Sequence, residues 1–266
     1  LVRIPRIYNS RIGVPLSIWQ MNKTQDLALI EAGISKAGEM QVLEEIIQPT
    51  LGVFTNIGEA HDEGFENPEA KILEKLRLFR KAEALIYPSD DELLHRTIQS
   101  WHKAYPGVKL FSFGGKGSAL RVISKKKAGG SMELTVEYDG LTWPLLVGFA
   151  HEAAIQNVLT CITVLLYLGV SAAGLQPELL RLSPVAMRME IQTGINHCSV
   201  INDSYSADVS SLKMALDFLS WQQQHPKRTV ILSDIPESGR SPEDLYRELA
   251  LLLKKYKVDR LIAIGE

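Results

Sequence analysis

The order of apolar and polar positions near the start of the chain predicts a strand, a helix and a second strand. Leu27–Ile30 is a short continuous apolar run, which is typical of a strand buried on both faces. Apolar residues recur at helical spacing in Glu39–Ile47, and Pro49 would end that helix. Leu51–Ile57 is a second run of strand-forming residues. Because so short a unit makes a crossover between parallel strands, we expect both runs to lie in one parallel sheet.

Similar patterns predict the rest of a first domain. Asn67 and Pro68 are typical of a helix start, and that helix would run through Arg80. Asp139-Gly140 lies between two strand-like runs and predicts a type I′ hairpin, so antiparallel strands would extend or flank the parallel sheet. The other expected elements are strands at Ala84–Tyr87 and Leu110–Phe113 and helices at Asp91–Tyr105 and Glu152–Leu168.

Strand–helix alternation in the rest of the chain predicts a second parallel α/β domain. Val170–Pro184 contains Ala, Gly, Pro and Ser and would link the domains, with a short helical turn at Pro177–Leu182. We expect an α/β protein. Residues 1–182 would form a central parallel-sheet domain of the ATPase type with an added antiparallel hairpin, and residues 183–266 an incomplete Rossmann-like domain. The elements expected in this second domain are strands Ser199–Asn202, Thr229–Leu232 and Arg260–Ile264 and helices Ser210–Gln224 and Pro242–Lys255.

The composition is that of a globular protein, with 45% hydrophobic and 23% charged residues among 266. The net charge of −2 gives no basic patch that would argue for nucleic acid. No apolar run approaches the roughly 18 residues of a membrane span, and no signal peptide is evident. Cys161 and Cys198 are too few for a disulfide framework, which predicts two buried, reduced thiols in a cytoplasmic protein.

Two polar residues follow the first two predicted strands. Glu31 comes directly after Leu27–Ile30, and His61 lies just beyond Leu51–Ile57. Both would leave the carboxyl edge of the expected sheet, where ligands bind in open α/β folds. One carboxylate and one imidazole at that edge indicate a metal or a phosphate-bearing substrate. The alternative is a solvated loop glutamate and a structural histidine, because short motifs carry false positives.

Several short motifs resemble those of the Mur ligases, ATP-dependent enzymes that join amino acids or peptides to the peptidoglycan precursor. The motifs of the central domain are Glu31-x-Gly33, Gly38-Glu39, Pro49, Thr55-Asn56-Ile57 and Ala60-His61. Tyr8–Leu16 is similar to the segment after the P-loop in the member that joins D-Ala-D-Ala to UDP-MurNAc-tripeptide. The resemblance covers essentially the whole chain. It implies this reaction, through an acyl phosphate, with ATP and Mg²⁺.

The resemblance also implies a magnesium site. Glu31 and His61 would hold one Mg²⁺, and Lys75, in the matching segment Glu74–Phe79, would be carbamylated by CO₂. A carbamate turns a cation into the oxygen ligand that magnesium prefers. By the same resemblance, His61 and Lys75 would both act in catalysis. The alternative is that Lys71 and Lys75 are ordinary solvated lysines one helical turn apart.

Three further positions would contact ATP if the resemblance holds. Asn157 would read adenine, because an Asn amide can pair with N6 and N7 of that base. Arg188 would act in catalysis by reaching the terminal phosphates, a role that suits its planar fork of donors. Asp203 would contact the ribose. We expect the two domains to hinge, so that closure brings Arg188 and Asp203 to the ATP site.

Some segments depart from the family pattern. The spacing between His151 and Asn157 differs from the usual one, and His151 would then be only a loop residue. Ser206 and Val209 stand where the family member has other residues. Ser233–Gly239 resembles a loop near the incoming amine, and the alternative is a turn that leads into a helix.

The ends of the chain suggest a piece of a longer protein. It starts with Leu1 rather than Met and ends just after the predicted strand Arg260–Ile264. By resemblance, the P-loop and the domain that grips the UDP moiety would precede Leu1. We expect these residues alone to be inactive and to bind ATP poorly, as part of a monomeric ligase unit within a longer chain.

Two other functions are compatible with the sequence. One is a different Mur-type ligase or an enzyme like folylpolyglutamate synthase, against which the Tyr8–Leu16 segment argues. The other is a non-catalytic α/β scaffold that keeps the fold without turnover. The gene sequence upstream of Leu1 would separate a scaffold from a ligase, because a scaffold need not keep the P-loop.

Overall fold

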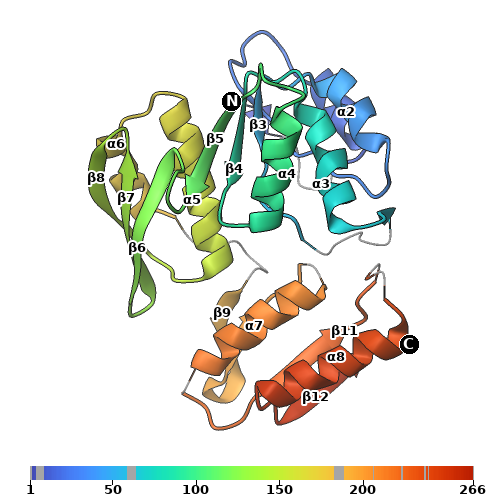
Figure 1. The fold of residues 1–266 in the computed structure, drawn as a ribbon. Helices are drawn as coiled ribbons and strands as arrows, with labels where there is room; N and C mark the ends of the chain where they lie inside the picture. The colour runs from blue at the N-terminus through green and yellow to red at the C-terminus, as the bar shows by residue number, and fades with distance from the viewer. Residues whose placement is uncertain are drawn as a thin grey trace. The chain divides into compact units, whose positions relative to one another are not determined.

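The computed structural model describes residues 2–3, 9–58, 64–182, 189–205, 207–222, 224–236, 238 and 240–265. The chain divides into two compact units, and the boundary after the first long unit falls between Leu180 and Arg181. Figure 1 shows the helices and strands of each unit, coloured along the chain from the N-terminus to the C-terminus. None of the helices in these ranges is long and apolar enough to cross a membrane.

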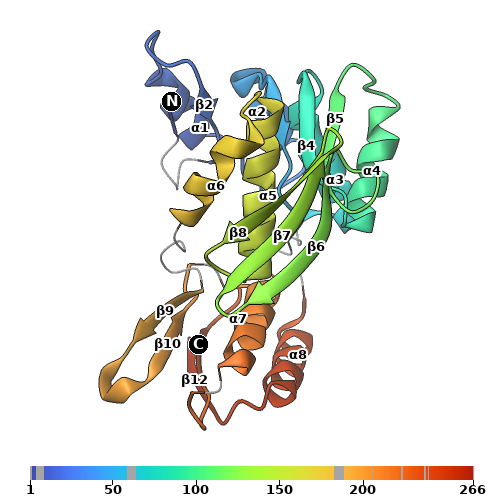
Figure 2. The same ribbon diagram turned by 90° about the vertical axis from the view of Figure 1, so that its left-hand side faces the viewer.

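The first unit is built on a six-stranded sheet of order β3-β4-β5-β6-β7-β8. Strands β3 to β6 are parallel neighbours, whereas β6, β7 and β8 pair in antiparallel fashion (Figure 2). The strands are β3 (Leu51–Val53), β4 (Ala84–Pro88), β5 (Lys109–Gly114), β6 (Leu120–Ala128), β7 (Ser131–Tyr138) and β8 (Leu141–Val147). The predicted α/β class, with a mostly parallel sheet and an added antiparallel hairpin, is confirmed.

The predicted hairpin joins β7 to β8. Tyr138 pairs with Leu141, so the connection has two residues, Asp139 and Gly140. Their φ angles are 51° and 73°, the left-handed values that a type I′ turn requires at both positions. The Asp-Gly signal therefore located this turn correctly.

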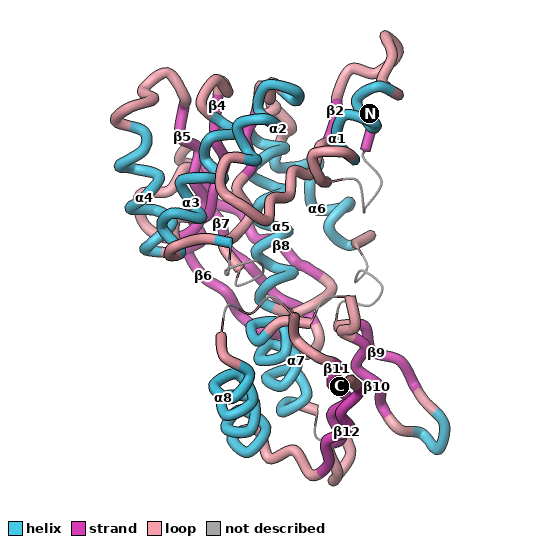
Figure 3. The backbone as a smooth tube through the Cα atoms, turned by 90° about the vertical axis from the view of Figure 1, so that its right-hand side faces the viewer, coloured by secondary structure: helices cyan, strands magenta, loops and turns pink. Residues whose placement is uncertain are grey.

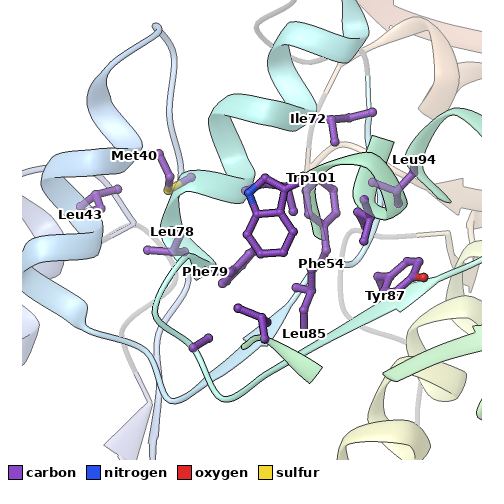
Figure 4. Packing of buried hydrophobic residues seen from close by; sticks show 14 of the residues in the cluster. Met40, Leu43, Phe54, Ile72, Leu78, Phe79, Leu85, Tyr87, Leu94 and Trp101 are labelled. Atoms are coloured by element: carbon purple, nitrogen blue, oxygen red, sulfur yellow. The ribbon is translucent and has the colours of Figure 1, made fainter. Parts of the chain in front are cut away.

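Helices cover both faces of the parallel strands. Figure 1 shows α3 and α4 on one side of β4 and α5 on the other. Leu85 and Tyr87 of β4 belong to a buried cluster with α3 and α4, whereas Ile86 belongs to a second cluster with α5. Figure 4 shows side chains of the first cluster. The helices of this unit are α1 (Gly13–Trp19), α2 (Glu39–Ile47), α3 (Pro68–Leu76), α4 (Glu92–His102), α5 (Glu152–Tyr167) and α6 (Ala172–Leu180).

The first predicted strand does not lie where the pattern placed it. Strand β2 (Ala28–Leu29) pairs in parallel with β1 (Val2–Arg3) in a separate two-stranded sheet. Leu29 is 57% exposed, so β2 is not buried on both faces, and no pairing of β2 with β3 is found among the described residues. A four-residue apolar run carries too little periodicity to distinguish a central strand from an exposed one, which explains the error.

The segment predicted as a linker is mostly helical. Residues 172–180 form α6, whose Leu175 and Leu179 are buried at a spacing of one helical turn. The Gln176 side chain accepts a hydrogen bond from the Leu146 backbone nitrogen (2.9 Å) and donates one to its carbonyl oxygen (3.1 Å). These hydrogen bonds fix α6 to β8. The leucine pair gives the segment an apolar face at helical spacing, which explains why it forms a helix.

The second unit contains two small sheets. Strands β9 (Glu190–Thr193) and β10 (Ser199–Asn202) form an antiparallel hairpin, which the sequence pattern did not predict (Figure 3). Strands β11 (Thr229–Ser233) and β12 (Arg260–Ile264) pair in parallel, as expected. Helices α7 (Val209–Trp221) and α8 (Pro242–Lys255) pack on one core, which includes Leu216, Val230 and Leu249.

Candidate functional site

The candidate metal ligand Glu31 lies in an exposed loop after β2, and a residue from the start of the chain holds it. The Asn9 side-chain nitrogen Nδ2 donates a hydrogen bond to Glu31 Oε1 at 3.0 Å. The Asn9 carbonyl oxygen also accepts a bond from the Gly33 backbone nitrogen at 2.8 Å. Asn9 of the Tyr8–Leu16 motif thus contacts both Glu31 and Gly33, although the sequence analysis gave Asn9 no role.

Lys75 lies in the last turn of α3 and is half-buried. Burial lowers the pKa of its ammonium group, and so does the positive charge of Lys71. The negative charge of the Glu31 carboxylate acts in the opposite direction and raises that pKa. A lowered pKa increases the share of neutral amine, the form that reacts with CO₂ to give a carbamate.

Lys71 does not fit the alternative of two solvated surface lysines. Its side chain is only 3% exposed, one turn before Lys75 on the same helix. Helix α3 itself begins as predicted: Pro68 is at its first position, and Asn67 Oδ1 accepts a bond from the Ala70 nitrogen at 2.8 Å. The helix start at Asn67 and Pro68 therefore determines which turns of α3 carry Lys71 and Lys75.

Glu74, the neighbour of Lys75, holds the loop that follows Glu31. Its Oε1 accepts hydrogen bonds from the backbone nitrogens of Gly38 (2.7 Å) and Met40 (3.2 Å) at the start of α2. Its Oε2 lies 3.1 Å from Nε of Arg77, and the Glu74 side chain is 4% exposed. Sequence reasoning missed this role, because nothing in the local pattern distinguishes Glu74 from a solvated helix residue.

Two predicted site residues, His61 and Arg188, lie outside the described residues, as does Ser206. Within the described ranges, no group of three or more His, Cys, Asp or Glu side chains is arranged to hold a metal ion. The donors that fit magnesium there are the Glu31 carboxylate and, once carbamylated, Lys75, because magnesium prefers oxygen ligands. An ammonium group at Lys75 would not fit a magnesium ion, so Lys75 would serve as a ligand only as its carbamate.

The candidate adenine residue lies on the helix that packs behind the central strands. Gln156 Nε2 donates a hydrogen bond to the Thr55 carbonyl oxygen at 3.1 Å, which ties α5 to the loop after β3. Asn157 follows Gln156 and is exposed. His151 is more than a loop residue, because its Nδ1 accepts a bond from the Ala154 nitrogen at 3.3 Å and caps α5.

In the second unit, two predicted motifs meet at one end of the β9–β10 hairpin. Glu190 pairs with Asn202, and Asp203 Oδ1 accepts a hydrogen bond from the Met189 nitrogen at 3.1 Å. Asp203 is thereby held beside Met189. Val209, which departs from the family pattern, is 5% exposed and belongs to the core of this unit.

Comparisons with known proteins show which family this chain resembles. Residues 4–165 match the model of the Mur ligase middle domain. The UDP-N-acetylmuramoyl-tripeptide–D-alanyl-D-alanine ligase of Bacillus subtilis is 26% identical over 262 residues, which cover 97% of this chain and 55% of that protein. The ligase of the same name from Borreliella burgdorferi is 26% identical over 259 residues, again covering 97% and 55%. The chain thus spans little more than half the length of these relatives.

Solved structures show the same fold. The crystal structure of MurF from Acinetobacter baumannii superposes with a TM-score of 0.84 at 23% identity, covering 99% of this chain and 57% of that one. The MurF ligase from Thermotoga maritima in complex with ADP gives 0.79 at 18% identity, covering 100% and 64%. Since the middle-domain match takes in residues 4–165 of 266, the chain belongs to the Mur ligase family.

Proposed function

We propose that this chain is the nucleotide- and metal-handling part of a ligase that joins D-Ala-D-Ala to UDP-MurNAc-tripeptide at the expense of ATP. The observation that carries the proposal is the hydrogen bonding of the Glu31–Gly38 loop. Asn9 donates to Glu31 at the start of this loop, and Glu74, the neighbour of Lys75 on α3, accepts from Gly38 at its end. The names of the relatives supply the substrate class. The Tyr8–Leu16 motif, which contains Asn9, favours this ligase over other Mur-type enzymes.

The chemistry asks the protein mainly to position anionic groups. A substrate carboxylate attacks the γ-phosphate of ATP and becomes an acyl phosphate, from which the incoming amine displaces phosphate. Glu31, His61 and carbamylated Lys75 would hold Mg²⁺, which neutralises phosphate charge when bound. The lowered pKa of Lys75 supports its role, because carbamylation needs the neutral amine.

The remaining proposed contacts are to ATP. Asn157 would hydrogen-bond adenine from the exposed side of α5, and Asp203 would accept from a ribose hydroxyl. Arg188 would donate to the terminal phosphates as charge moves to the departing ADP. Each role places a donor or acceptor opposite the matching group of the nucleotide.

Phosphate release by the full-length protein tests the proposal. UDP-MurNAc-tripeptide and D-Ala-D-Ala are each supplied or withheld, and release is expected only when both are present. Lys75→Ala should abolish release, whereas Lys103→Ala, an exposed lysine at the end of α4, should not change it. Release with another amino acid or dipeptide in place of D-Ala-D-Ala would indicate a different ligase. A folded protein that releases no phosphate with any of them would support the scaffold alternative.

A further inference from the structure

We propose that Asn9 is a positioning residue for magnesium: its amide turns one oxygen of Glu31 toward the protein and so directs the other oxygen to the metal. The inference rests on the proposed function, because it requires Glu31 to be a metal ligand. Asn9 itself would not touch the metal or the substrates.

Two hydrogen bonds connect Asn9 with both ends of the Glu31–Gly33 segment. The side-chain Nδ2 donates to Glu31 Oε1 at 3.0 Å, and the backbone carbonyl accepts from the Gly33 nitrogen at 2.8 Å. An amide nitrogen is a neutral donor, so it orients the carboxylate without cancelling its charge. Oε2 of Glu31 is therefore the oxygen that we assign to the metal.

On one side of this contact a glycine leaves room for the Asn9 amide, and on the other side hydrogen bonds hold the backbone. A Cβ atom at position 33 would lie 3.1 Å from Asn9 Nδ2 and 3.2 Å from Asn9 Cγ. Glycine at this position thus leaves the room that the Asn9 amide occupies. On the other side, Ser10 Oγ accepts a hydrogen bond from the Gly13 backbone nitrogen at 3.2 Å. The Ser10 carbonyl oxygen accepts a second bond from the Val14 backbone nitrogen at 2.9 Å. The start of α1 therefore holds the backbone next to Asn9.

Orientation matters at this position because Glu31 is an exposed side chain in a loop. Without the bond from Asn9, rotation about the side-chain bonds of Glu31 would leave its carboxylate with no fixed direction. Partners that orient metal ligands typically contribute 10- to 100-fold to metal affinity. We expect a change of about that size on removal of the Asn9 amide.

Binding of Mn²⁺ to the full-length protein, followed by electron paramagnetic resonance in the presence of ADP, tests the proposal. Mn²⁺ takes oxygen ligands and so reports on the proposed magnesium site. Asn9→Ala should raise the Kd for Mn²⁺ about 10- to 100-fold. Gly33→Ala, which keeps the amide but crowds it, should raise the Kd by less. The control is Asn22→Ala. In the part of the chain that the structure describes, the Asn22 side-chain oxygen accepts hydrogen bonds only from the nearby Thr24.

A second readout separates positioning from a purely structural role. For Asn9→Ala, the Mg²⁺ concentration at half-maximal phosphate release should rise, while kcat at saturating Mg²⁺ should stay near the wild-type value. A loss of kcat that Mg²⁺ does not restore, together with a lower unfolding temperature, would overturn the proposal in favour of a structural role.

Glu31→Gln distinguishes failure of this inference from failure of the proposed function. If Glu31→Gln weakens Mn²⁺ binding and Asn9→Ala does not, only the role of Asn9 is overturned. If Glu31→Gln leaves Mn²⁺ binding unchanged, Glu31 is not a ligand, and both the metal site and the role of Asn9 fail.

Discussion

Glu74 Oε1 accepts a hydrogen bond from the Gly38 backbone nitrogen at 2.7 Å, and this bond joins α3 to the start of α2. The two residues lie in different motifs of the sequence. Gly38 ends the loop that begins at Glu31, whereas Glu74 precedes the proposed carbamate, Lys75. The contact therefore fixes the far end of the Glu31 loop to the helix that carries its proposed partner.

Glu74→Ala should destabilise the first unit by about 2–3 kcal/mol, because it leaves two backbone N–H groups at the start of α2 without their charged acceptor. Urea unfolding followed by circular dichroism measures the effect. The control is Glu45→Ala, an exposed carboxylate within α2, which should change stability by less than about 0.5 kcal/mol. Equal effects of the two substitutions would show that the Glu74 contact contributes nothing specific.

Gly64→Ala should displace the Glu31 loop. A Cβ atom at position 64 would lie 1.9 Å from the Ser35 carbonyl oxygen, so the backbone of one segment must move. Such overpacking costs about 1–3 kcal/mol, and phosphate release should fall because Ser35 lies between Glu31 and Gly38. Gly107→Ala is the matched control, since its added Cβ would meet nothing within 4 Å. An unfolding temperature of Gly64→Ala equal to that of the wild type would contradict the predicted close approach.

Glu39 should make the stability of this loop depend on pH. The backbone N–H groups of Ser35 and Lys36 donate to its carboxylate and lower its pKa from 4.5, Ser35 having the larger effect. A group with a lowered folded-state pKa stabilises the protein above its unfolded pKa, and this contribution disappears as pH falls through the folded value. The stability difference between wild type and Glu39→Gln should therefore be larger at pH 7 than at pH 3.5. A difference that does not change with pH in urea titrations would refute this role for Glu39.

Local sequence signals were sufficient to locate helix starts and tight turns. Helix α8 begins at Pro242 with Ser241 as its cap, as predicted, because capping and a first-turn proline act within four residues. The Asp139-Gly140 turn was located for the same reason. By contrast, the position of Leu27–Ile30 depended on which strand would pair with it, and an apolar run of four residues does not encode that choice.

The candidate site was predicted only where a motif could be matched. Glu31 and Lys75 came from a resemblance, and their role as metal ligands stays a prediction. Asn9 and Glu74 were missed, because each acts through a partner more than 20 residues away. Contacts of this range depend on the tertiary fold, so no periodicity or spacing in the sequence reveals them.

Asp203→Ala in the full-length protein should raise the KM for ATP about tenfold, the cost of losing a charged acceptor for a ribose hydroxyl. The substitution also removes the bond from the Met189 nitrogen, so a second variant is needed to separate the two effects. Asp203→Asn keeps an oxygen that can accept from Met189 and should raise the KM by less. If Asp203→Asn raises the KM for ATP as much as Asp203→Ala does, the carboxylate charge is what matters. If neither raises it, Asp203 does not contact the nucleotide.

Asn157→Ala should reduce the preference of the full-length protein for ATP over ITP, which carries an oxygen where adenine carries its N6 amino group. A bidentate Asn–adenine contact contributes about 1–3 kcal/mol, so the ratio of kcat/KM values for the two nucleotides should fall about 5- to 150-fold. Gln156→Ala is the neighbouring control, because Gln156 bonds the Thr55 carbonyl oxygen and not, in our proposal, the base. It should lower stability and leave the nucleotide ratio unchanged. An ATP-to-ITP ratio that survives in Asn157→Ala and falls in Gln156→Ala would instead assign adenine recognition to the loop after β3, with α5 acting only as its support.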